Sequence, residues 1–125
     1  MTRYGEVGPR PAGTVMTVTF ELDGQEFMGL NGGSEFTFSE VVSFIVNCDT
    51  QEEIDEYWEK LSAGGQKVQC GWLKDKFGVS WQIVPTVLGE MLQDRDPQKT
   101  NRVMKAVLGM IKLDIKRLQQ AYAGQ

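Results

Sequence analysis

The 125-residue chain contains no histidine. Imidazole is the usual nitrogen ligand of zinc, iron and nickel and the usual general base near neutral pH, so histidine-based metal centres and histidine-dependent catalysis are excluded. Only two cysteines are present, Cys48 and Cys70. They are too few for a disulfide framework, and we expect a cytoplasmic protein with reduced thiols. We also predict that the protein holds no metal ion and no other cofactor.

Long runs of positive charge and of apolar residues are missing as well. The net charge is −4, and a nucleic-acid surface needs clustered lysine and arginine, so we expect no nucleic-acid partner. No apolar stretch is long enough to cross a membrane, and residues 1–6 lack the apolar core of a signal peptide. The length and the ordinary balance of charged and apolar residues predict one domain with no membrane partner.

Alternation of apolar and polar side chains predicts a hairpin in the first part of the chain. Residues 1–13 are rich in glycine and proline and leave room only for a short edge strand near residues 2–6. Val15 to Leu22 alternates cleanly, and Gln25 to Leu30 returns as its partner after the turn signal Asp23-Gly24. The face with Met16, Val18, Phe20 and Leu22 is apolar. We expect a partner subunit or the C-terminal helix to cover it.

The middle of the chain predicts a strand, a helix and two further strands. Residues 41–48 form an almost continuous apolar run, which indicates a central strand. Thr50 and Glu53 are spaced as a capping box, and Gly64-Gly65 should end the helix that follows. Strands are predicted over residues 67–74 and 79–84. Beyond them, Asp96 and Pro97 begin a helical region, read as one long helix or as two joined near Gly109.

The segments 71–85 and 43–48, together with the Glu56–Leu61 helix, resemble the PhnB-like, 3-demethylubiquinone-9 3-methyltransferase-like branch of the glyoxalase/bleomycin-resistance/dioxygenase (vicinal oxygen chelate) superfamily. The resemblance implies an α+β fold in which paired βαβββ modules form a curved mixed sheet, commonly within a homodimer. Residues 1–33 would be the remnant of a first module that lacks its usual strand and helix. Residues 39–85 would be the second module and residues 86–125 a C-terminal helical extension, all within one domain.

The same resemblance implies where a ligand would bind. Metal-using relatives place their ligands on the inner face of a cupped sheet. Ser43 falls at the position of their histidine, Gln82 at that of their glutamate, and Phe27 at a third ligand position. Strand alternation adds Asn47 and Ser80 to this surface, with Ile45 and Val84. Neutral Ser43 and Gln82 favour a small organic ligand over a metal ion. The alternative is a shallow groove whose polar groups bond only to one another and to ordered water.

Several other residues carry two interpretations. Trp72 suits either a ligand platform or the core, whereas Trp81 should lie on the opposite face and pack under the helix that contains Tyr57 and Trp58. The two cysteines are read as small buried apolar residues rather than nucleophiles. The Lys74–Lys76 turn is read as a solvated hairpin tip.

Three functions remain open from the sequence. The first is metal-independent binding of a small molecule, the second a methyltransferase-like enzyme as the family label suggests, and the third a resistance-type protein that sequesters a drug. No glycine-rich turn follows a strand in the way that a Rossmann-type S-adenosylmethionine site requires. The sequence does not decide whether any reaction is catalysed.

Overall fold

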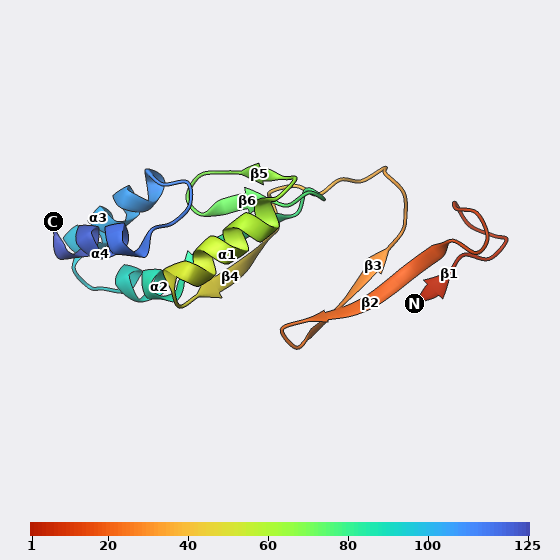
Figure 1. The fold of residues 1–125 in the computed structure, drawn as a ribbon, viewed down its shortest axis with the longest axis horizontal. Helices are drawn as coiled ribbons and strands as arrows, with labels where there is room; N and C mark the ends of the chain where they lie inside the picture. The colour runs from red at the N-terminus through yellow and green to blue at the C-terminus, as the bar shows by residue number, and fades with distance from the viewer. The chain divides into compact units, whose positions relative to one another are not determined.

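The computed structural model describes residues 1–125, which divide into two compact units, residues 1–37 and residues 38–125 (Figure 1). The first unit is a three-stranded antiparallel sheet in the order β1-β2-β3. Its strands are β1 (Thr2–Arg3), β2 (Val15–Leu22) and β3 (Gln25–Leu30). The predicted bounds of β2 and β3 are confirmed. The turn between them has positive φ at both central residues, 49° at Asp23 and 78° at Gly24, as a tight hairpin demands.

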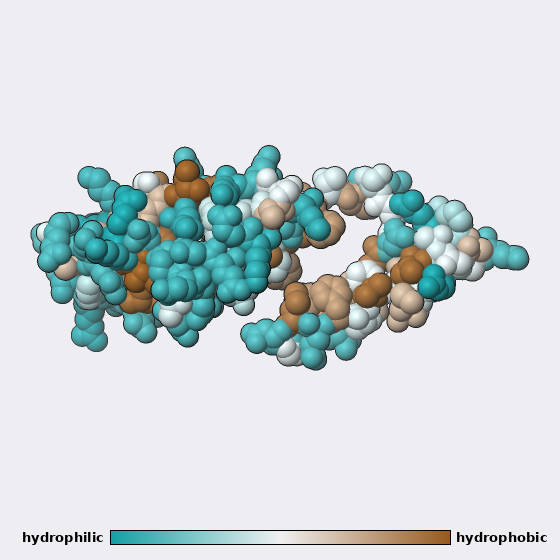
Figure 2. All heavy atoms as spheres, viewed as in Figure 1, coloured by the Kyte–Doolittle hydropathy of each residue, from teal (hydrophilic) through white to brown (hydrophobic).

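The apolar face of the hairpin stays open to solvent. Phe20 and Phe27 are cross-strand partners whose rings stack with centroids 5.7 Å apart. Even so, Val18, Phe20 and Leu22 are 43%, 44% and 48% exposed. Apolar side chains gather over β2 and β3 in Figure 2.

The second unit contains a four-stranded mixed sheet in the order β4-β7-β6-β5. The chain runs through β4 (Ser43–Cys48), α1 (Gln51–Ser62), β5 (Gln66–Lys67), β6 (Trp72–Lys74) and β7 (Ser80–Pro85). β4 is parallel to β7, and the other neighbours are antiparallel. This strand–helix–three-strand order and the α+β class are as predicted.

Two strand predictions were wrong. β4 lies at the edge of its sheet rather than at the centre, with Phe44 and Ile45 exposed. The residues expected to form one strand over 67–74 instead form a short antiparallel hairpin of β5 and β6, with a break in the ladder between them. The break lies at Cys70 and Gly71, whose φ values of 63° and 82° turn their amides out of the ladder. These amides donate instead to the carbonyls of Met110 and Ile111, both at 2.8 Å.

Helix α1 covers one face of the four-stranded sheet. Thr50 Oγ1 accepts from the amide of Glu53 at 3.2 Å, so the hydroxyl arm of the predicted capping box forms. Glu53 Oε2 accepts from the amide of Asp49, one residue before the cap, at 3.3 Å instead of from the amide of Thr50. The core beneath the helix consists of Cys48, Ile54, Trp58, Leu73 and Ile83. Trp81 packs against this cluster, as predicted, while Tyr57 is exposed.

Three helices follow the sheet: α2 (Thr86–Leu92), α3 (Pro97–Leu108) and α4 (Ile115–Ala123). Asp96 caps α3 as predicted, with Oδ1 accepting from the amide of Gln98 at 2.9 Å. Of the two alternatives left open, separate helices are correct. They enclose a second core of Leu88, Met91, Val103, Val107, Met110, Leu113 and Leu118. None of the helices is long and apolar enough to span a membrane.

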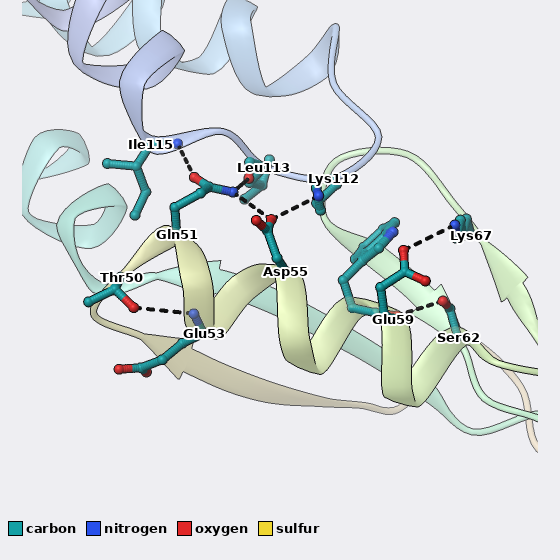
Figure 3. Close-up of polar contacts among 11 residues, drawn as sticks. Thr50, Gln51, Glu53, Asp55, Glu59, Ser62, Lys67, Lys112, Leu113 and Ile115 are labelled. Carbon is teal, nitrogen blue, oxygen red and sulfur yellow. Dashed lines mark hydrogen bonds and ion pairs between the residues drawn. The ribbon is translucent and has the colours of Figure 1, made fainter.

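One glutamine joins α1 to the loop between α3 and α4 (Figure 3). Gln51 Nε2 donates to the carbonyl of Leu113 at 3.1 Å, and Gln51 Oε1 accepts from the amide of Ile115 at 2.8 Å. An ion pair between Lys112 and Asp55 at 2.8 Å lies beside it. The C-terminal helices are therefore held to the same unit as the sheet.

Candidate functional site

Ser43 and Gln82 lie together on the face of the sheet that α1 does not cover. Ser43 is the register partner of Ser80 on the parallel strand, and Gln82 follows Ser80 by two residues. Gln82 Nε2 donates to Ser43 Oγ at 2.9 Å. Both side chains are half-buried. The bond leaves the Ser43 hydroxyl proton and the Gln82 amide carbonyl available to a further partner.

Of the other predicted site residues, some lie beside Ser43 and Gln82 and some do not. Trp72 is the register partner of Gln82 and is half-buried, so its side chain stands beside the amide. Asn47 lies at the far end of β4 and is exposed. Phe27 belongs to the first unit, where it stacks on Phe20. Val84 packs against the second core, so the C-terminal helices cover the surface at that point.

Ser80 is the unusual member of this group. It is 1% exposed, and its hydroxyl has no hydrogen-bond partner. A buried hydroxyl without a partner costs about 1–3 kcal/mol. Ser43 and Gln82 bond to each other, whereas the Ser80 hydroxyl has no protein partner.

The end of β6 and the turn after it contain two residues whose roles the sequence did not indicate. Asp75 Oδ1 accepts from the amides of Phe77 and Val79, at 2.9 and 3.0 Å, and Oδ2 accepts from Trp81 Nε1 at 3.0 Å. The spacing Asp75-x-x-Gly78, an Asx-turn pattern, is the signal that could have identified it. Lys74, read as part of a solvated tip, forms an ion pair with Glu40.

The thiols offer no activated nucleophile. Cys48 is fully buried, and burial, followed by the charges of Glu53 and Asp49, raises the pKa of its thiol above the ordinary value. A raised pKa reduces the thiolate fraction at neutral pH. Cys70 is half-buried and packs against the second core. The reading of both as small apolar residues fits this geometry.

The residues at the site do not fit a divalent transition metal. No three His, Cys, Asp or Glu side chains gather where they could hold one ion. Ser43 and Gln82 provide only neutral oxygen atoms, and these are weak ligands for zinc, iron or nickel. A hollow of about 290 Å³ lies elsewhere, on the outer side of α1, lined by Glu53, Glu56, Tyr57 and Lys60.

Comparisons with known proteins agree with this fold. The family model described as 3-demethylubiquinone-9 3-methyltransferase matches residues 1–84. A PhnB protein from Bacillus cereus, provisionally described as a 3-demethylubiquinone-9 3-methyltransferase, is 41% identical. The match covers 68% of this chain and 75% of that one, with a TM-score of 0.59. Protein PA1353 from Pseudomonas aeruginosa is 19% identical, with coverages of 66% and 73% and a TM-score of 0.50, which shows likeness of fold alone. No curated protein matches the chain.

Proposed function

Because the chain belongs to the 3-demethylubiquinone-9 3-methyltransferase family and has PhnB-like structural neighbours, we propose that it is a PhnB-like protein that binds a small organic molecule without a metal ion. The ligand lies on the face of β4, β6 and β7 that carries Ser43 and Gln82. A surface with a few polar groups among apolar side chains is typical of small-molecule sites.

One observation carries this proposal: the bonded pair Ser43–Gln82 lies beside a buried hydroxyl, Ser80, that lacks a partner. Ser43 and Ser80 are register partners, so the two hydroxyls are neighbours across adjacent strands. Trp72 adds an aromatic surface on the other side of Gln82. Polar donors and an aromatic ring in one place favour a ligand with both polar and flat apolar parts.

A thermal-shift screen tests the proposal. Small metabolites, antibiotics and S-adenosylmethionine are added to the wild type, to Gln82→Ala and to Gln119→Ala, which changes an exposed glutamine on α4. A ligand at 100 times its Kd adds about 2.7 kcal/mol of stability, so binding raises the unfolding temperature. We expect this increase in the wild type and in Gln119→Ala but not in Gln82→Ala.

The screen separates the alternatives. Stabilisation by S-adenosylmethionine that depends on Gln82 would favour the methyltransferase-like function. Stabilisation by an antibiotic alone would favour drug sequestration. If no compound stabilises the wild type, or if Gln82→Ala responds like the wild type, the proposed site is wrong.

The proposal includes a homodimer in which a second copy covers the apolar face of β2 and β3. Val18, Phe20 and Leu22 remain exposed on that face, and the buried side chains of α2, α3 and α4 belong to a core of their own. Covering a side chain of this size contributes about 1.5–3 kcal/mol. The C-terminal helices, the other predicted cover, are thus already engaged in the second unit.

Sedimentation velocity over a series of concentrations checks this prediction. We expect a dimer for the wild type and a shift toward monomer for Phe20→Thr, because threonine keeps the strand preference while removing the aromatic contact. Thr19→Val, on the other face of β2, serves as the control and should remain dimeric. A monomeric wild type at all concentrations would contradict the proposal.

A further inference from the structure

We infer that the ligand of the proposed site is a small organic carboxylate, that Lys74 is the cation that recognises it, and that Glu40 competes with it from within the chain. This inference rests on the proposed function and adds to it the ligand class, a recognition residue and an internal competitor. It is built from three features of the second unit: the position of Lys74, the ion pair that Lys74 makes, and the hydroxyl of Ser80.

Lys74 lies on the same face of the sheet as the proposed site. It is the register partner of Ser80, and Trp72, two residues earlier on β6, is the partner of Gln82. Leu73, between them, points into the core under α1. Because side chains alternate along a strand, Lys74 and Trp72 share the opposite face with Ser80 and Gln82. The site therefore contains a positive charge that the sequence reading had assigned to a hairpin tip.

The charge of Lys74 is paired with a carboxylate of the chain itself. Glu40 lies in the irregular segment before β4, and its carboxylate contacts the Lys74 ammonium group. The hydrogen bond from Lys74 lowers the pKa of Glu40, which keeps the carboxylate ionised. The two side chains are 31% and 59% exposed. An exposed pair of this kind contributes little to stability, so another carboxylate can displace Glu40.

Ser80 provides the second, independent sign of a ligand. Its hydroxyl is buried without a partner directly beside Lys74 and beside Ser43. The Ser43 oxygen accepts from Gln82, which leaves the Ser43 proton free to donate. One ammonium group and two hydroxyl donors thus lie on adjacent positions of three strands. Charge-assisted hydrogen bonds from such a set suit a carboxylate.

Asp75, the acidic residue of the turn between β6 and β7, does not compete for the position beside Lys74. Asp75 uses both carboxylate oxygens on the Phe77 and Val79 amides and on Trp81 Nε1. Trp81 packs against the core on the α1 side of the sheet. Because Glu40 pairs with Lys74, its carboxylate occupies the position at which the carboxylate of a ligand would bind. Trp72 offers a flat apolar surface to the rest of the ligand.

The test uses benzoate as the carboxylate and benzamide as its neutral counterpart. Titration calorimetry is run on the wild type, Glu40→Gln, Lys74→Gln and Glu59→Gln. Glu59→Gln is the matched control, because Glu59 forms a similarly exposed pair with Lys67 at 3.6 Å away from the site. Thermal unfolding of each variant confirms that it is folded.

We expect Glu40→Gln to bind benzoate up to about fivefold more tightly, since the weak internal ion pair no longer competes. Lys74→Gln should lose benzoate binding, and Glu59→Gln should match the wild type. Benzamide should bind more weakly than benzoate in every variant that keeps Lys74. The double variant Glu40→Gln/Lys74→Gln should behave like Lys74→Gln.

Equal benzoate affinity in the wild type and Glu40→Gln, or retained binding in Lys74→Gln, would overturn the inference. Failure of benzoate to bind any variant would overturn it as well. A different result would overturn the carboxylate while leaving the proposed function intact. If a neutral compound from the thermal-shift screen binds in a Gln82-dependent way while Glu40→Gln and Lys74→Gln have no effect, the site is real and its ligand is not a carboxylate.

Discussion

Replacement of Gly65 by alanine should destabilise the second unit by about 3 kcal/mol or more, because overpacking against atoms that cannot yield typically costs about 1–3 kcal/mol and sometimes more. A Cβ at this position would stand 2.0 Å from the carbonyl oxygen of Lys74 and 2.7 Å from the carbonyl carbon of Asp75. Both are backbone atoms of the turn that closes β6, so no rotamer change relieves the clash.

Urea unfolding followed by tryptophan fluorescence measures this loss, since Trp58, Trp72 and Trp81 all lie in the second unit. Gly89→Ala is the matched control. Gly89 lies inside α2, and a Cβ there would have nothing within 4 Å. Alanine favours a helix over glycine by about 1 kcal/mol, so this variant should be slightly more stable than the wild type. An unchanged urea midpoint for Gly65→Ala would show that the packing of the segment between α1 and β5 against Lys74 and Asp75 is wrong.

Leu73→Ala should reduce the free energy of unfolding by about 2–5 kcal/mol, the range for deleting a buried leucine side chain. Leu73 is 0% exposed and lies in the cluster under α1 with Ile54, Trp58 and Ile83. The neighbours are held by the sheet and the helix, so the cavity left by the substitution cannot close fully. The loss should appear as a lower urea midpoint with an unchanged slope.

Leu108→Ala provides the comparison for this experiment. Leu108 is the last residue of α3 and is 64% exposed, so its replacement removes little buried area. We expect a change of less than about 0.5 kcal/mol. If the two leucine variants were equally stable, Leu73 would not lie in the core and the register of β6 against β7 would be in error.

The sequence was most informative where two local signals coincided. The bounds of β2 and β3 were predicted because apolar and polar residues alternate along residues 15–22 and the turn signal Asp23-Gly24 follows directly. The cap at Thr50 and the helix start at Asp96 were found for the same reason: a polar cap residue precedes a helical pattern. In each case, the interactions that decide the structure lie within a few residues of one another.

The sequence was least informative where the deciding partner is distant. An apolar run such as β4 does not reveal whether it has one neighbouring strand or two, and so its edge position was missed. The amide of Cys70 bonds to Met110, and no local signal marks that pairing. The same holds for the candidate site. The family resemblance placed Ser43 and Gln82 on one face, but the ion pair of Lys74 with Glu40 depends on a loop whose path is set by tertiary structure.

The hydrogen bonds from Cys70 and Gly71 to Met110 and Ile111 have a consequence for biosynthesis. These two amides lie at the break between β5 and β6, and their acceptors are synthesised forty residues later. While the nascent chain is still shorter than that, these two amides lack their protein acceptors and can bond only to water. The second unit should therefore reach its final structure only after Ile111 has emerged from the ribosome. A chain that stops at Leu108 should be less stable than the whole protein.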